Sequence, residues 1–209
     1  MDILSELFGS VMRVKMMRIF LFNQGNSFDI EYIEGKTDAK PSNIKKEIIF
    51  FKKLGLIKPK KLIKTITFTL KKGKKVINKK RKIKAWTLDS NFKYIEALTD
   101  FLVRTHSLEH KAIVRRLEKA GRMKAVIVSG IFMGDAESRL DLFIVGDNVK
   151  SGSIDRIVRS IESDMGKDIR YAVLSGPDFA YRVNMNDKLV RDVLDFPHTI
   201  LVDKIGIAR

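Results

Sequence analysis

Hydrophobic and polar positions alternate at helical spacing near the start of the chain. Residues 11–23 place Val14, Met17 and Phe20 among basic side chains, and the polar residues Asn-Gln-Gly-Asn follow, which is typical of a helix and its end. A second, shorter helix is predicted over residues 28–35, with Asp29 near its start. The pattern therefore predicts two consecutive helices separated by a few polar residues.

A third helix is predicted to begin at Pro41 and to end at Gly55. Proline suits the first helical position because the missing N–H would have no partner there. Ile44, Ile48 and Phe51 then follow at helical spacing and define one buried stripe. Glycine is the usual residue after a helix end, so we expect a helix with one buried side and a strand directly after it.

A β-hairpin is predicted next, from two segments rich in β-branched and aromatic residues. Residues 65–70 are expected to pair with residues 83–88, leaving a long tip that contains Gly73 and Asn78. Trp86 is expected to fill the core beneath this sheet rather than to stack on a nucleic-acid base.

The pattern in the second half of the chain predicts short helices and strands. Strands are expected at 124–131, 139–146, 169–175 and 199–202, with helices at about 92–103, 108–120, 153–165 and 187–194. The predicted fold class is therefore α+β. Its domains are expected at residues 1–90, a helical connector at 91–122, and a small α/β domain with a mixed sheet at 123–209.

Charge divides the chain unevenly. Residues 1–90 hold 22 Lys and Arg against 8 Asp and Glu, a net charge of +14, whereas residues 91–209 hold 19 against 17, a net of +2. The segment 71–84 is rich in Lys and Arg and has no acidic residue. Such asymmetry favours a polyanionic partner for the first domain only. Nucleic acid is the first candidate, because no amphipathic basic helix supports the alternative of an anionic membrane surface.

Composition excludes several other classes. The chain has no cysteine, which rules out disulfides and thiolate metal sites. Its beginning lacks the basic and apolar regions of a secretory signal, and no run of 18 apolar residues predicts a membrane span. We therefore expect a soluble, cytoplasmic protein without a membrane partner.

One short motif matches a metal-binding signature. Residues 106–110, His-Ser-Leu-Glu-His, match the inverted zinc-protease signature. Ser107 is expected to cap the following helix, which would separate the two histidines and break their alignment on one helical face. No metal site is therefore expected. Asp187 is expected to be a helix cap and His198 a turn residue, without catalytic roles.

The segment from Pro41 to Ile57 resembles the recognition-helix region of prokaryotic winged-helix transcriptional regulators, and the resemblance covers about residues 8–90. It implies double-stranded DNA as partner and binding as a homodimer. Asn43 can read adenine and Lys46 guanine, although lysines that contact only phosphate are the alternative. Ile49 is expected to touch a thymine methyl group or a partner subunit. The candidate DNA-binding residues are Ser42, Asn43, Lys45, Lys46, Ile49, Lys53, Lys71, Lys72, Lys74, Lys75, Lys79, Lys80, Arg81 and Lys82.

Residues 123–209 resemble a minimal nucleotidyltransferase domain of the DNA polymerase beta superfamily. Gly130 and the loop Gly134-Asp135-Ala136 match the family pattern, in which Gly-Ser precedes an Asp-x-Asp strand and a further acid follows on the next strand. Here Ile131 replaces the serine. Asp141 is the only acid left of the Asp-x-Asp pair, because its possible partner position holds Arg139 or Phe143.

Nucleotidyl transfer needs two Mg²⁺ ions bridged by carboxylates, which a single aspartate does not provide. We therefore expect no catalytic residues and no cofactor; Mg²⁺ enters only if the domain is an active enzyme. The leading hypothesis is a DNA-binding transcriptional regulator whose silent C-terminal domain dimerises or senses a small-molecule ligand. The alternatives are a nucleotidyltransferase that acts on nucleic acid or on a partner protein, and an RNA-binding or antitoxin-like protein.

Overall fold

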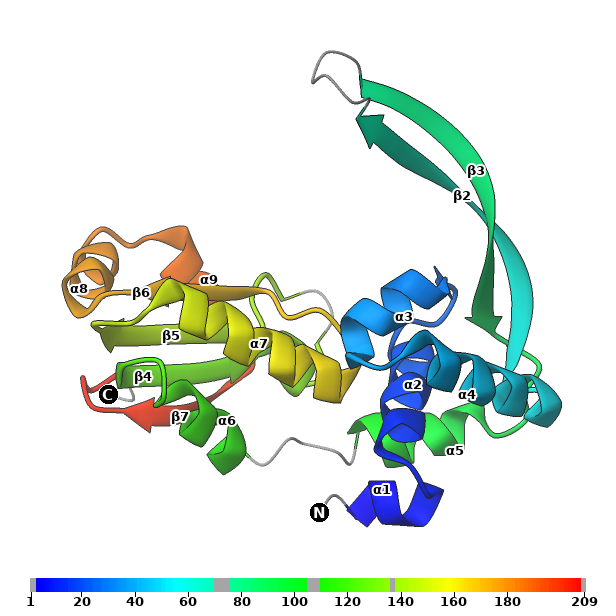
Figure 1. The fold of residues 1–209 in the computed structure, drawn as a ribbon. Helices are drawn as coiled ribbons and strands as arrows, with labels where there is room; N and C mark the ends of the chain where they lie inside the picture. Colours follow the sequence, from blue (N-terminus) through cyan, green and yellow to red (C-terminus); the bar gives the residue numbers. More distant parts are fainter. Residues whose placement is uncertain (1–2, 70–75, 105–109, 136–137, 208–209) are drawn as a thin grey trace. The chain divides into compact units, whose positions relative to one another are not determined.

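The computed structural model describes residues 3–69, 76–104, 110–135 and 138–207. The fold is α+β and divides into two compact units, Met1–Val103 and Arg104–Arg209, called here the N-unit and the C-unit (Figure 1). The segment expected as a connector is thus divided between the units, with one helix in each. Within the described ranges, no helix has the length and apolar character needed to cross a membrane.

The N-unit packs its helices around one apolar core. Met16, Ile19 and Phe20 of the second helix are fully buried and lie at the centre of this core. The elements are α1 (Ile3–Phe8), α2 (Val11–Phe22), β1 (Ser27–Phe28), α3 (Ile30–Thr37), α4 (Pro41–Leu54), β2 (Ile57–Thr69), β3 (Val76–Leu88) and α5 (Ile95–Thr99), which continues into a π-helical turn at Asp100–Arg104.

Helix α4 has the predicted boundaries. Pro41 is its first residue, and Gly55 ends it with a left-handed backbone at φ +76°. Ile44, Ile48 and Phe51 are all buried, as their spacing predicts. The position of α3 was predicted less well. It begins two residues later than expected, because Phe28 belongs to β1 and pairs with Trp86 of β3. Trp86 packs against the core, in line with its predicted role.

The register predicted for the hairpin is wrong. Strands β2 and β3 are each 13 residues long and pair from Ile57 opposite Leu88 to Thr69 opposite Val76. Ile83, expected opposite residues 65–70, lies opposite Leu62 instead. Ile57 and Leu88 are buried in the core at the base of the hairpin, so the register is fixed there. The basic residues 79–84 therefore lie along a strand and not at a tip.

The C-unit contains a four-stranded mixed sheet with the order β6-β5-β4-β7 (Figure 1). Strand β6 runs parallel to β5, and the other neighbouring pairs are antiparallel. The elements are α6 (His110–Leu117), β4 (Arg122–Ser129), a 3₁₀ turn (Gly130–Phe132), β5 (Leu142–Asp147), α7 (Ser151–Met165), β6 (Tyr171–Leu174), α8 (Gly176–Asn184), α9 (Lys188–Asp195) and β7 (His198–Asp203).

Helices cover both faces of this sheet. Ile127 and Phe143 face α8 and α9 and form a core cluster with Phe179 and Val193. Alternate strand residues point to the opposite side, where α6 and α7 lie (Figure 1).

Helix α8 was not predicted, although the sequence has two features that are typical of a helix start. The Ser175 hydroxyl caps its start by accepting a hydrogen bond from the N–H of Asp178, and Pro177 follows in the first turn. Asp187 caps α9, as predicted, through the N–H groups of Leu189 and Val190. His198, expected to lie in a turn, is the first residue of the edge strand β7.

Candidate functional site

The hairpin of β2 and β3 has two different faces. Opposed residues of antiparallel strands share a face, and successive residues alternate between faces. The pairing of Lys61 with Lys84 and of Ile63 with Lys82 therefore defines one face, to which Lys80 also belongs. The base of this face, at Ile57 and Leu88, is buried in the core, and its exposed part beyond the base is called here the outer face. The inner face carries the alternate residues Lys58, Lys60, Lys64, Lys79 and Arg81.

Acidic residues pair with two lysines of the inner face, Lys58 and Lys64. The Lys64 Nζ lies 2.6 Å from the Glu31 Oε2 and 3.2 Å from the Asp29 Oδ2, next to α3. These hydrogen bonds, the one to Glu31 first, raise the pKa of Lys64 above its ordinary value. The Lys58 Nζ lies 3.0 Å from the Asp89 Oδ1 and lowers the pKa of Asp89. Lys64 therefore ties the hairpin to α3, whereas Lys58 pairs with the residue that directly follows β3.

Lysines of the outer face have no such partners. Lys61, Lys80, Lys82 and Lys84 are exposed, and none of them forms an ion pair with a residue in the described part of the chain. Lys61 and Lys84 stand directly opposite each other, an arrangement of like charges that destabilises a hairpin. Ile63 follows Lys61 on the same face, toward the far end of the hairpin, and its side chain is 66% exposed. The outer face is thus a basic surface without internal neutralisation.

Helix α4 shows the same division of charge. Ser42, Lys45, Lys46, Ile49 and Lys53 are all exposed, and their spacing of three, one, three and four residues aligns them along one side of the helix. Ile49 is 68% exposed, and Asn43 is exposed beside this stripe.

The single acid of α4 lies away from that stripe. Arg13 of α2 binds the Glu47 carboxylate, with Nε 2.8 Å from Oε2 and Nη2 3.2 Å from Oε1. The guanidinium also lies 4.0 Å from the centre of the Phe50 ring. The one negative charge of α4 is therefore neutralised by Arg13, and the exposed stripe of the helix is basic.

The structure separates the predicted hairpin residues. Lys80 and Lys82 lie on the outer face, whereas Lys79 and Arg81 lie on the inner face. Lys71, Lys72, Lys74 and Lys75 lie outside the described residues. Lys61 and Ile63, which sequence reasoning missed, belong to the outer face because the strands pair further along than expected.

In the C-unit, Asp141 is fully buried and both of its carboxylate oxygens are engaged. Its Oδ1 accepts hydrogen bonds from the Ile131 N–H at 3.0 Å and from the Arg170 Nη2 at 2.9 Å. Its Oδ2 accepts from the Arg170 backbone N–H at 2.9 Å and from the Arg170 Nε at 3.0 Å. The pairing with Asp141 raises the pKa of Arg170. A carboxylate held by four donors is a structural anchor.

Gly130 makes room for this anchor. Its backbone has φ +52°, and a Cβ at this position would lie 2.2 Å from the Asp141 Oδ1. Gly134 also has a positive φ, +76°, but nothing lies within 4 Å of its Cβ position. The loop closes through the Asp135 N–H, which donates to the Gly130 carbonyl at 2.9 Å. The glycines thus serve the loop geometry, while Ala136 lies outside the described residues.

Comparison with known proteins adds no family to these observations. No protein-family model, curated protein or solved structure matches this chain. Among the residues with described positions, no group of three His, Asp or Glu side chains is arranged to hold a metal ion. The candidate sites are therefore assigned from the chain's own geometry.

Proposed function

We propose that the N-unit is a winged helix that binds double-stranded DNA, and that the protein is a transcriptional regulator. In this proposal α4 enters the major groove and the outer face of the hairpin follows the phosphate backbone. The observation that carries the proposal is the division of charge on the hairpin. On the inner face Lys58 and Lys64 pair with acids of the same unit, whereas none of the exposed outer lysines has a described acidic partner.

The spacing of the outer lysines supports a regular polyanion as the partner. Residues on one face of a strand recur about every 6.6–6.8 Å. Phosphates recur regularly along each strand of B-DNA, one for every base step. A row formed by Lys80, Lys82 and Lys84 is therefore suited to a backbone with regularly repeated negative charges. Bound phosphates would also relieve the repulsion between Lys61 and Lys84 and release counterions.

The exposed stripe of α4 favours DNA over double-stranded RNA. The major groove of B-DNA admits an α-helix, whereas the deep, narrow major groove of A-form RNA does not. Asn43 and Lys46 lie in the first two turns of α4, where a recognition helix contacts base edges. Regulators of this kind bind two-fold sites as dimers, and a homodimer is part of the proposal.

The C-unit plays no catalytic role in this proposal. Asp141 is the only acid of the expected Asp-x-Asp pair, and it is held by the Arg170 guanidinium and by two backbone N–H groups. Binding a metal ion would require these hydrogen bonds to break around a buried carboxylate, which costs several kcal/mol. Dimerisation or ligand sensing is the role that we propose for this unit.

The decisive test replaces Lys80, Lys82 and Lys84 together by Ala and measures DNA binding by fluorescence anisotropy over a range of salt concentrations. The slope of log K against log salt is expected to fall in magnitude by about 2.7, which is about 0.9 for each phosphate that the variant no longer neutralises.

The control variant replaces three exposed lysines of the C-unit, Lys119, Lys188 and Lys204, and so removes the same charge. It is expected to keep the wild-type slope. Equal slopes for both triple variants would contradict the hairpin interface. Equal affinity for an RNA duplex of the same sequence would contradict the assignment to DNA.

A further inference from the structure

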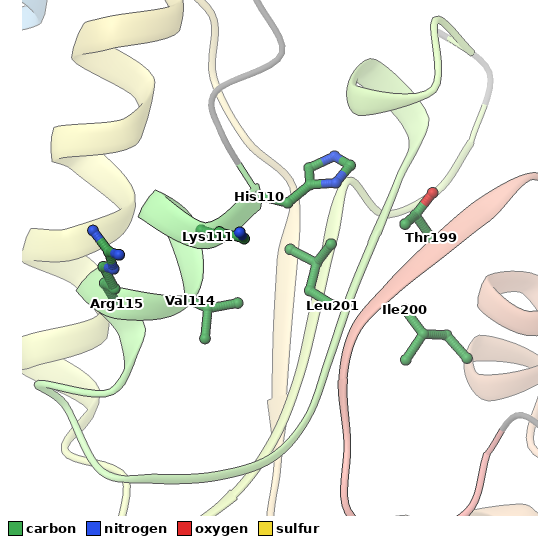
Figure 2. Close-up of a pocket in the computed structure, with 7 residues that line it drawn as sticks. All are labelled: His110, Lys111, Val114, Arg115, Thr199, Ile200 and Leu201. Atoms are coloured by element: carbon green, nitrogen blue, oxygen red, sulfur yellow. The ribbon is translucent and has the colours of Figure 1, made fainter.

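A hollow in the C-unit lies between α6 and the edge strand β7. Its volume is about 450 Å³, within the range of pockets that hold small molecules. Figure 2 shows His110, Lys111, Val114 and Arg115 on α6, and Thr199, Ile200 and Leu201 on β7. All seven of these described residues belong to the C-unit, so the hollow that they line lies within one compact body.

The charge of this hollow is of one sign. Lys111 and Arg115 lie four residues apart on α6 and are both exposed, and like charges at this spacing weaken a helix. No described acidic side chain pairs with either of them, and no Asp or Glu is among the described lining residues. An anion between the two side chains would remove their repulsion.

The neighbouring Arg116 differs from Arg115, because it has an acidic partner within the fold. Its Nη1 lies 2.8 Å from the Asp164 Oδ2 and 3.3 Å from the Ser160 Oγ, and so it ties α6 to α7. Two adjacent arginines on one helix thus have opposite uses. Arg116 is neutralised within the fold, and Arg115 lines the hollow.

The remaining lining combines the polar His110 and Thr199 with the apolar Val114, Ile200 and Leu201. Val114 projects from α6, and Leu201 projects from β7 (Figure 2). Inorganic phosphate would use the basic side chains but leave this apolar surface in contact with water. An acidic group attached to an apolar body would use both parts.

We propose that this hollow binds a small organic anion, with its acidic group between Lys111 and Arg115 and its apolar body against Val114 and Leu201. A second copy that docked through the same surface would bring the same basic side chains into contact, which like charges disfavour. The proposal is independent of DNA binding, since it rests on residues of the C-unit alone.

The test uses the full-length chain and the fluorescent aromatic anion 8-anilinonaphthalene-1-sulfonate as the probe. Wild-type protein is compared with Lys111→Gln/Arg115→Gln, which alters exposed residues only, and with the control Lys119→Gln, which alters an exposed lysine that does not line the hollow. Circular dichroism checks that each variant is folded. The double variant is expected to bind one class of probe site at least about tenfold more weakly, since charge-assisted hydrogen bonds are removed.

Competition then identifies the ligand chemistry. Benzoate is expected to displace the probe from the wild-type site, and inorganic phosphate at the same concentration is not. Equal probe binding by the wild type, the double variant and the control would overturn the site. Displacement by phosphate as effective as that by benzoate would overturn the assignment of an apolar body.

Discussion

The hairpin of the N-unit and the Asp141 anchor of the C-unit use charged groups in opposite ways. On the outer face, Lys61 and Lys84 oppose each other in solvent without a described acidic partner. In the anchor, a buried carboxylate has four hydrogen bonds from Arg170 and the Ile131 N–H. A charge that is satisfied internally stabilises the fold and has little left to offer a ligand. A charge that the fold leaves unsatisfied marks a surface that a partner completes.

The largest expected effect tests the anchor through its glycine. Gly130→Ala is expected to lower the free energy of unfolding by at least about 3 kcal/mol, because the new Cβ would overlap the Asp141 carboxylate at a backbone conformation already unfavourable for alanine. Gly134→Ala shares the positive φ without the overlap and is expected to cost about 1–2 kcal/mol. Urea denaturation measures both. Equal losses of unfolding free energy in the two variants would show that overlap with the Asp141 carboxylate adds nothing to the cost of Gly130→Ala.

A second variant asks whether the anchor has any role beyond stability. Asp141→Asn is expected to cost about 3 kcal/mol of unfolding free energy, since the new amide cannot accept all four hydrogen bonds. DNA affinity below the unfolding transition is expected to be unchanged. Wild-type protein incubated with labelled nucleoside triphosphates and Mg²⁺ or Mn²⁺ is expected to transfer no label. Metal-dependent labelling that disappears in Asp141→Asn would show that the C-unit is catalytic. It would contradict the purely structural role of the Asp141 anchor.

Asn43→Ala and Lys46→Ala extend the comparison from phosphate contact to base contact. Each is expected to cost about 1–3 kcal/mol on a DNA site selected from a random library, and much less on unrelated DNA. Anisotropy titrations against both DNAs at one salt concentration measure the difference. Equal losses on the two DNAs would mean that α4 positions the protein without reading sequence.

The smallest effect concerns the like-charged pair itself. Lys61→Glu would place opposite charges across the strands and is expected to stabilise the N-unit by about 0.5 kcal/mol, while weakening DNA binding. Lys60→Glu makes the same charge change opposite Ala85 and is expected to give no such stabilisation. Thermal denaturation and anisotropy together report the two effects. A Lys61→Glu protein that is less stable than Lys60→Glu would contradict the unfavourable placement of Lys61 and Lys84.

Local patterns in the sequence determined the best-predicted parts of the protein. The limits of α4 follow from Pro41 and Gly55, and its buried side follows from Ile44, Ile48 and Phe51. The uneven charge is a property of composition alone. These features depend on residues within one or two helical turns, so they need no knowledge of distant contacts.

Only the tertiary structure decided the features that join distant residues. The hairpin register depends on burial of Ile57 and Leu88 at its base, and that register sorts the lysines into two faces. The pairing of Asp141 with Arg170 joins positions 29 residues apart. Strand segments rich in β-branched residues fit several registers equally well, and a one-residue shift moves every side chain to the other face. Spacing within the sequence therefore identified the basic residues, but the packed core determined which of them are left for a partner.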